Sequence, residues 1–202
     1  MVEPLCDSHA ALPEKIRAFV AIRIPDEVLA QLGSVQQQLK REFQEASWTR
    51  AEAMHLTLLF LGNIESARLP ELTPALRDAT REFNAFEVEP SGIGSFGHRV
   101  LWVGIKHGAE PLTLLANSVR NATEAFAAHE EERPFNAHVT LGRFRRPARG
   151  VAKILTALKE PRFDSWRVAH FELIRSELSP KGARYTTLAD FPLRQGEKNV
   201  EC

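Results

Sequence analysis

Cysteine is scarce in this sequence of 202 residues, where Cys6 and Cys202 stand at opposite ends of the chain. Two cysteines placed in this way exclude a disulfide framework and a Cys-x-x-Cys metal site. Long apolar runs are also lacking, since no segment approaches the roughly 20 apolar residues that span a bilayer. Residues 1–16 contain acidic residues and prolines, where a secretion signal has a basic start and an apolar run. We therefore expect a cytoplasmic protein that does not contact a membrane.

An excess of charge of one sign is missing too. The chain has 26 basic and 26 acidic residues, so its formal net charge is +0. A protein that coats long stretches of nucleic acid needs a strongly basic face, and we expect no such coating surface here. A short or terminal nucleotide remains compatible with this composition. With 44% hydrophobic residues, the chain can bury a substantial core as one domain or as two small lobes.

The sequence does contain an internal repeat. HLTL at residues 55–58 resembles HVTL at residues 138–141, an offset of 83 residues (138 − 55). The same offset places residues 19–22 on residues 102–105 and needs no gap. It also matches three apolar positions of the first half, Leu29, Leu32 and Phe43, with Leu112, Leu115 and Phe126. These matches indicate two copies of a strand, helix, strand module.

Each matched block has the periodicity of its element. Residues 17–24 and 100–106 are short and rich in β-branched and aromatic residues, which predicts strands. Apolar residues spaced by threes and fours predict a helix over 26–43, with Asp26 as its N-cap, and a second helix with Pro111 in its first turn and Phe126 on its apolar stripe. Further helices are expected near 69–83 and 151–159. Strands are expected near 86–91, 168–177 and 185–191, the last two separated by a turn at 179–182.

The predicted fold is α+β and bilobal. Two antiparallel-sheet lobes with helices outside are related by a pseudo-twofold, and the active-site cleft lies between them. We expect one domain over residues 16–193, with repeat units at about 17–83 and 100–160, and flexible tails at 1–15 and 194–202.

The repeated triplet brings histidine and threonine together. Because residues i and i+2 of a strand share a face, His55 projects with Thr57 and His138 with Thr140. If the lobes face one another, two imidazoles and two hydroxyls meet in one space. This set suits hydrolysis of a strained phosphodiester: one imidazole takes a proton from water, the other protonates the leaving oxygen, and the hydroxyls donate to phosphoryl oxygens. The scheme requires no metal and no cofactor.

Several blocks in order resemble a known family, the RNA 2′,3′-cyclic phosphodiesterases of the 2H phosphoesterase superfamily, historically called 2′-5′ RNA ligases. The blocks are IRAFVAIRIP, HLTLLFLG, RVLWVGI, PFNAHVTLGRF and LIRSELSPKGARYTTLADFPL, within residues 16–193. The resemblance implies a bilobal fold, a cofactor-free site, and opening of a cyclic phosphate to a 2′-phosphate. It implies that His55 is the proton donor and His138 the acceptor. The chain departs from the family pattern at Glu52 and Met54, where proline and asparagine are usual.

Several of these residues also have structural interpretations that do not involve catalysis. A single HxT triplet is expected by chance, so the register of the pair carries the argument. His9, His98, His107, His129 and His170 lack such context and are assigned to the surface or to structure. Phe19 and Trp102, at equivalent repeat positions, are expected in the core. The cluster Arg143, Arg145, Arg146 and Arg149 is typical of a solvated face, although Arg143 could reach an RNA phosphate at the cleft rim.

Residues near the predicted turn at 179–182 are further candidates for RNA contacts. They are Lys181 and Tyr185, whose ring could stack on a base or belong to the core. The expected partners are RNA 3′ ends or small cyclic nucleotides, bound by a monomer. Two other functions stay open: a nucleotide-binding module without turnover, and ligation that joins RNA ends through a 2′-5′ linkage.

Overall fold

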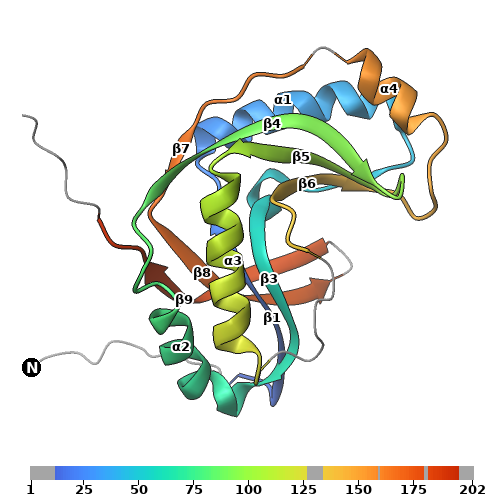
Figure 1. The fold of residues 1–202 in the computed structure, drawn as a ribbon. Helices are drawn as coiled ribbons and strands as arrows, with labels where there is room; N and C mark the ends of the chain where they lie inside the picture. The colour runs from blue at the N-terminus through green and yellow to red at the C-terminus, as the bar shows by residue number, and fades with distance from the viewer. Residues whose placement is uncertain (1–11, 127–133, 159, 180–181, 196–202) are drawn as a thin grey trace, which may run out of the picture.

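The computed structural model describes residues 12–126, 134–158, 160–179 and 182–195, which form a curved nine-stranded sheet and four α-helices (Figure 1). The pairs between the named strands are antiparallel. This confirms the predicted α+β class. In chain order, the elements are β1 (Lys15–Arg23), α1 (Asp26–Glu42), β2 (Ser47–Trp48), β3 (His55–Glu65), α2 (Leu69–Asp78), β4 (Phe86–Phe96), β5 (Val100–His107), α3 (Ala109–Thr123), β6 (His138–Arg143), α4 (Val151–Ala157), β7 (Trp166–Val168), β8 (His170–Ser179) and β9 (Gly182–Pro192).

The elements repeat with the spacing of the sequence. Helices α1 and α3 begin at Asp26 and Ala109, which are 83 residues apart (109 − 26), and β3 and β6 begin at His55 and His138. Strands β1 and β5 precede these helices in the two halves. The predicted strand, helix, strand module is therefore present twice.

The two halves exchange their last strands. The strand order is β7-β4-β5-β6-β3-β1-β8-β9, with β2 paired to β6. Strand β4 belongs to the first half in sequence but pairs with β5 of the second, while β8 follows the second repeat and pairs with β1 of the first. One lobe is thus β7, β4, β5 and β6, and the other is β3, β1, β8 and β9. Because each lobe takes a strand from the other half, the lobes are not separate segments of the chain.

The lobes meet where the two HxT strands touch. Strand β3 pairs with β6 through Leu56 and Val139, the central residues of the two triplets. Both side chains are fully buried in the main hydrophobic core. This pair turns the two predicted sheets into one continuous sheet.

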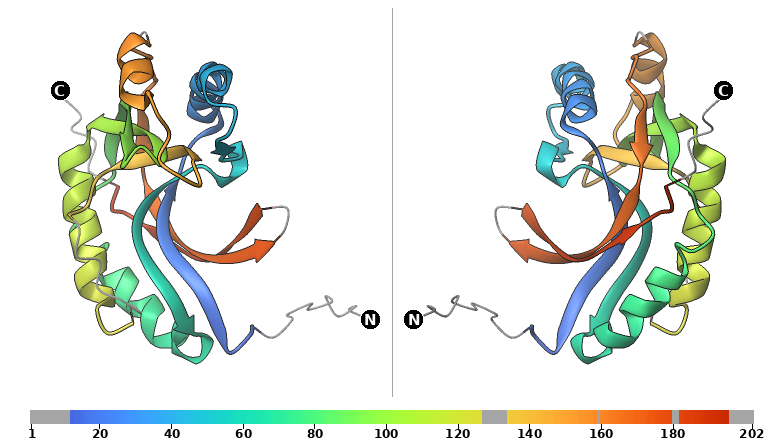
Figure 2. Two further views of the ribbon diagram at one scale, coloured as in Figure 1. Left: turned by 90° about the vertical axis from the view of Figure 1, so that its right-hand side faces the viewer. Right: turned by 90° about the vertical axis from the view of Figure 1, so that its left-hand side faces the viewer.

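The helices lie outside the sheet. Helices α2 and α3 cover the lobe of β1 and β3, and α1 and α4 lie over the lobe of β4 to β6 (Figures 1 and 2). Helix α1 is tied to β6 by the buried Gln36, whose side-chain nitrogen donates to the carbonyl oxygens of Leu141 at 2.9 Å and Thr49 at 2.7 Å. The concave face of the hairpin β8–β9 carries no helix (Figure 2).

Some predicted boundaries were wrong by a few residues. Pro25, not Asp26, is the N-cap of α1, because the Leu29 amide donates to the Pro25 carbonyl; Asp26 is the first helical residue, and no side chain caps the helix. The helix predicted at 69–83 ends at Asp78 and continues as turns. Phe126 lies beyond the end of α3. The strand predicted at 168–177 is divided into β7 and β8, and the middle of the predicted turn, 180–181, lies outside the described residues.

The predicted tails lie mostly outside the described residues. At the edges that are described, the Ser66 amide donates to the carbonyl of Glu14, and Arg194 exchanges backbone hydrogen bonds with Phe83 and Ala85. Ordered structure therefore begins before residue 16 and extends to at least residue 194.

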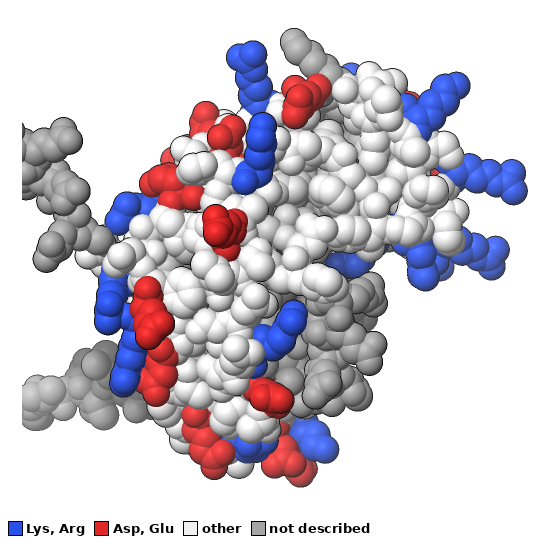
Figure 3. Space-filling view, viewed as in Figure 1, with Lys and Arg blue, Asp and Glu red and all other residues white. Residues whose placement is uncertain are grey.

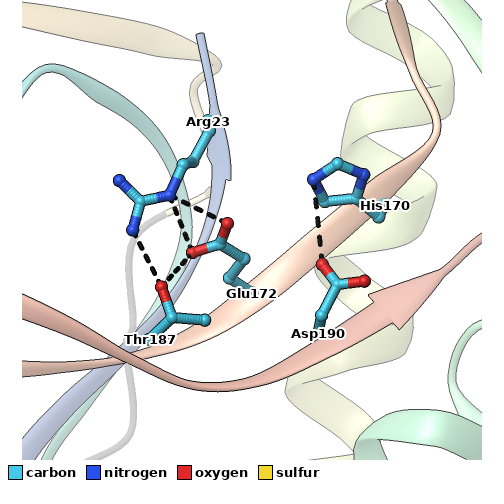
Figure 4. A network of polar contacts seen from close by, with 5 residues as sticks. All are labelled: Arg23, His170, Glu172, Thr187 and Asp190. Carbon is cyan, nitrogen blue, oxygen red and sulfur yellow. Dashed lines mark hydrogen bonds and ion pairs between the residues drawn. The ribbon is translucent and has the colours of Figure 1, made fainter.

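A buried carboxylate joins three strands of the lobe that contains β1, β8 and β9 (Figure 4). The Nε of Arg23 in β1 donates to both oxygens of Glu172 in β8, at 2.8 and 2.9 Å. Thr187 in β9 accepts from Arg23 Nη2 at 2.8 Å and donates to Glu172 at 2.7 Å. Glu172 is only 7% exposed, so these donors replace hydrogen bonds that water would make to an exposed carboxylate. The network fixes the hairpin β8–β9 against β1.

Removing the guanidinium should destabilise the protein. Arg23→Ala leaves Glu172 with the Thr187 hydroxyl, and we expect a loss of about 2 kcal/mol in the free energy of unfolding, measured in urea. Adding Glu172→Gln should recover part of this, because a neutral amide costs less to bury than an unpaired carboxylate. Arg167→Ala, at an exposed position of β7, is the matched control and should change stability by less than about 0.5 kcal/mol. Equal effects at both arginines would contradict a structural role for the network.

Candidate active site

The two triplets show the alternation expected of strands. Leu56 and Leu58 are buried, whereas His55 and Thr57 are partly exposed on the other face of β3. Val139 and Leu141 are likewise buried in β6, with His138 and Thr140 partly exposed. Burial of the alternate apolar residues thus turns each histidine and threonine away from the core.

The contact between β3 and β6 brings the four polar residues together. Since Leu56 pairs with Val139 in antiparallel register, His55 lies toward Thr140 and Thr57 lies toward His138. All four side chains line one cavity of about 430 Å³. The convergence predicted from the repeat is thus found in the structure.

Backbone carbonyls orient both imidazoles in the same way. His55 Nδ1 lies 2.9 Å from the Ala53 carbonyl oxygen, and His138 Nδ1 lies 2.7 Å from the Asn136 carbonyl oxygen. A carbonyl oxygen can only accept a hydrogen bond, so Nδ1 carries the proton in each ring. Each Nε2 then carries a free lone pair and accepts a proton when the ring is neutral, and it donates a proton when the ring is charged.

The loop that departs from the family pattern still supports His55. Residues Ala51–Ala53 form one turn of 3₁₀ helix, which presents the Ala53 carbonyl to the imidazole, and Met54 is buried in the core. Arg50, just before this turn, donates to the Ala183 carbonyl at 3.0 Å. The loop therefore also contacts the start of β9, which lines the cavity.

Aromatic rings surround each histidine. The His55 ring is 4.7 Å from Phe19 and 5.4 Å from Tyr185, between ring centroids. The His138 ring is 4.9 Å from Phe96 and 6.4 Å from Trp102. The prediction that Phe19 belongs to the core is confirmed, since Phe19 is buried, although it packs with Ala21 and Ile174 in a cluster separate from the main core. The same prediction for Trp102 was wrong, because Trp102 is partly exposed.

These surroundings lower the affinity of both imidazoles for protons. Burial lowers the pKa of His55 to about 4; the Ala53 hydrogen bond opposes this shift, and the nearby charges of Arg23, His138 and Arg143 add to it. Burial also lowers the pKa of His138, against the opposing effect of its Asn136 hydrogen bond. Both rings are therefore neutral in the free protein at pH 7.

Other predicted contacts are distributed around the cavity. Arg143 lines it at the end of β6, and Tyr185 lines it from β9. Lys181 lies outside the described residues. The structure adds two residues that sequence analysis missed, Arg17 and the 48% exposed Phe60. Arg17 could have been found from the alternation of β1, because it stands two residues before Phe19 on the same face.

A second cluster of ionisable residues lies on β8 and β9. Ligand atoms of His170, Glu172 and Asp190 lie within 4.8 Å of one another. Glu172 already accepts hydrogen bonds from Arg23, whose positive charge opposes a cation, and His170 pairs with Asp190 at 3.7 Å (Figure 4). These contacts explain the cluster without a metal. His98 and His107 are exposed, as expected of surface residues.

Known proteins are similar to this chain over most of its sequence. A profile of the 2′-5′ RNA ligase superfamily matches residues 24–180. An RNA 2′,3′-cyclic phosphodiesterase of Archaeoglobus fulgidus is 32% identical over 183 residues, 87% of this chain and 99% of the relative. One from Thermus thermophilus is 34% identical over 195 residues, 92% of this chain and 94% of the relative.

Solved structures give the same result for the fold. The crystal structure of E. coli LigT in its apo form matches with a TM-score of 0.76 and 26% identity, over 91% of this chain and all of that chain. LigT complexed with 3′-AMP matches with a TM-score of 0.71 over 89% of this chain.

Among the described residues, no helix of this protein is long and apolar enough to cross a membrane.

The lowered pKa of His55 should appear in the pH dependence of stability. The unfolded chain, with a histidine pKa near 6.5, binds more protons than the native state below that pH, so acidification favours unfolding. With a native pKa of about 4, the loss between pH 6.5 and pH 4 is on the order of 3 kcal/mol. His55→Gln should flatten this part of the curve in urea titrations, and His107→Gln, at an exposed site, should not. Parallel curves for wild type and His55→Gln would show that His55 is not held neutral.

Proposed function

Since the chain belongs to the 2′-5′ RNA ligase superfamily, we propose that it hydrolyses the 2′,3′-cyclic phosphate ends of RNA or nucleosides to 2′-phosphomonoesters. The names of several relatives, at 29–34% identity over most of the chain, support this activity. The observation that carries the proposal is the pairing of Leu56 with Val139, since it sets two similarly oriented imidazoles and two threonine hydroxyls into one cavity.

The proposed mechanism uses the imidazoles as an acid and base pair. His138 Nε2 accepts a proton from water as the water oxygen attacks phosphorus. The bond from phosphorus to the ribose 3′ oxygen breaks, and His55 Nε2–H protonates that oxygen. The product keeps the phosphate on the 2′ oxygen. The Nδ1 contacts of both rings favour this chemistry, because they hold the rings in place and leave each Nε2 for proton transfer.

The other residues of the cavity would bind the phosphate and the nucleoside. Thr57 and Thr140 would donate hydrogen bonds to the phosphoryl oxygens, whose charge grows in the transition state. Arg17 and Arg143 line the same cavity and would attract the anion. Tyr185 and Phe60 offer aromatic surfaces to a base, and the Tyr185 contact with His55 places that surface beside the proton donor.

The roles of the two histidines come from the family pattern, and the free protein alone would favour the opposite. A ring whose pKa is lowered to about 4 suits a base better than an acid. Binding of an anionic phosphodiester next to His55 raises its pKa, because an adjacent negative charge stabilises the imidazolium. The bound substrate would thus favour the protonated form of His55, which is the form that the proposed acid needs. With a 5′-hydroxyl as the nucleophile in place of water, the same groups would form a bond from the 5′ oxygen to phosphorus, break the bond from phosphorus to the 3′ oxygen, and leave a 2′-5′ linkage.

The activity can be tested with a nucleoside 2′,3′-cyclic phosphate in excess EDTA. We expect hydrolysis to continue, because proton transfer rests on two imidazoles, and the product to be the 2′-phosphate when the 2′ and 3′ isomers are separated by chromatography. Thr57→Ala and Thr140→Ala should each reduce kcat by about tenfold to a thousandfold. Binding without turnover would identify a nucleotide-binding module instead. Loss of activity in EDTA with rescue by one divalent ion would exclude the proposed mechanism.

The direction of proton transfer can be tested with an activated leaving group. His55→Ala and His138→Ala should both lose more activity on the natural substrate than the threonine variants do. A leaving group that needs no protonation should partly restore His55→Ala and leave His138→Ala inactive, as seen by single-turnover kinetics. The double variant should be little worse than the weaker single variant, because the two groups act as a unit. Rescue of His138→Ala alone would exchange the two roles.

The pH profile adds an independent check of the same pair. Both limbs of the kcat/KM profile should lie below pH 6.5, since burial lowers both pKa values in the free enzyme. The limbs of the kcat profile should lie at higher pH, because the bound phosphate favours the charged imidazole.

A further inference from the structure

Positive charge is concentrated beside the cavity in a chain whose net charge is zero. The stretch from residue 134 to residue 158 contains Arg143, Arg145, Arg146, Arg149 and Lys153 and has no acidic residue. The neighbouring stretch from 90 to 106, which includes the turn between β4 and β5, contains Arg99 and Lys106 and also has no acidic residue. A solvated face usually mixes both signs of charge, so this one-sided distribution calls for another explanation.

Four of these arginines form one surface, which we call the basic tip: Arg99, Arg145, Arg146 and Arg149. All four are exposed. In the ranges that the structure describes, none of them forms an ion pair with an acidic side chain. Basic side chains project from the right-hand edge of the upper lobe in Figure 3, near the turn of β4–β5 and α4, while most of the visible acidic groups lie elsewhere on that face.

Hydrogen bonds hold the basic tip in place. The Phe144 amide donates to the Arg99 carbonyl at 2.8 Å, and the Ala148 amide donates to the His98 carbonyl at 3.0 Å. The Arg99 guanidinium donates to the Arg145 carbonyl at 3.0 Å. The loop that follows β6 is therefore fastened to the β4–β5 turn. A binding surface that is already ordered loses less conformational entropy when a ligand binds.

The basic tip continues from the cavity. Arg143 lines the cavity and pairs with Val100 in β5, so Arg99 and Arg145 flank this pair in sequence. The other end of the cavity is bordered by the β8–β9 hairpin, through Ser176, Leu178 and Ala183. Two arginines line the cavity, Arg17 on β1 and Arg143 on β6, and a polyanion that leaves the cavity along β6 would pass from Arg143 to the basic tip.

We propose that the basic tip binds the phosphate backbone of the RNA strand whose 2′,3′-cyclic end occupies the cavity, so that the enzyme prefers oligonucleotides to mononucleotides. This inference rests on the proposed function and adds a substrate class to it. Arginines without acidic partners suit phosphate oxygens, which accept two parallel hydrogen bonds from one guanidinium. A strand held in this way is bound without regard to its sequence.

The test compares two substrates and two matched variants. The substrates are a nucleoside 2′,3′-cyclic phosphate and a single-stranded RNA of about a dozen nucleotides with the same terminal group. Arg145→Ala/Arg146→Ala removes two cations of the basic tip, and Arg162→Ala/Arg167→Ala removes two exposed cations in or near β7, which pairs with the end of β4 that lies away from the β4–β5 turn. We expect the first variant to raise KM for the RNA about tenfold or more at low salt and to leave mononucleotide hydrolysis unchanged. The second should leave both unchanged.

Direct binding separates this inference from the proposed activity. Fluorescence anisotropy with the same RNA ending in a 2′-phosphate measures Kd without turnover. In wild type, log Kd should depend on log salt, and Arg145→Ala/Arg146→Ala should reduce the slope by about 1.4, or 0.7 for each lost phosphate contact. Salt-dependent binding lost in this variant supports the basic tip even if no hydrolysis is seen. Equal Kd and KM values in both variants would overturn the inference and leave mononucleotide hydrolysis as the test of the activity. Binding to vesicles rich in anionic lipid, without binding to RNA, would overturn it as well.

Discussion

The contact between Leu56 and Val139 is the constraint on which the site depends. It lies at the centre of both HxT triplets, and both side chains are fully buried. Because side chains alternate along a strand, burial of these two residues turns the histidines and threonines to the opposite face. A slip of either strand by one residue would bury an imidazole and expose an apolar side chain, so the hydrophobic core itself fixes the register. The polar site is therefore positioned by apolar packing directly behind it.

The exchange of strands between the halves makes this contact stable. Strand β8 returns to β1 and strand β4 reaches β5, so each lobe contains chain from both repeats. Helix α1, from the first repeat, is held on β6 of the other lobe by Gln36. Moving the lobes apart would break these pairings together with the core beneath them. A site of this kind holds two imidazoles at fixed positions. Fixed positions are what the proposed proton transfer at a phosphodiester would require.

Local patterns in the sequence were enough for the repeat, the main elements and the convergence of two histidines and two threonines on one cavity. They were not enough for the partners of β4 and β8, because periodicity shows that a segment is a strand and not which strand it pairs with. Phe19 and Trp102 were expected in the core from their equivalent repeat positions; Phe19 is buried but also contacts His55, and Trp102 is partly exposed beside His138. Hydrophobicity does not distinguish a core from the wall of a cavity. The arginines at 145, 146 and 149 were read as a solvated face, since their alignment with Arg99 and the cavity depends on the fold.

The two histidines are equivalent in the repeat but not in the folded protein, so the two sides of the cavity differ. His55 contacts Tyr185 of β9, an edge strand of 11 residues, whereas the corresponding edge strand of the other lobe, β7, has 3 residues. The β8–β9 hairpin therefore forms a wall near His55, and deeper burial there lowers its pKa to about 4. On the side of His138, strand β6 leads through Arg143 to the basic tip. A terminal nucleotide would meet the wall and the proposed acid, and the rest of the strand would leave across the cations. Two nearly identical sequence motifs thus acquire different surroundings, because the strands added at the two edges of the sheet differ in length.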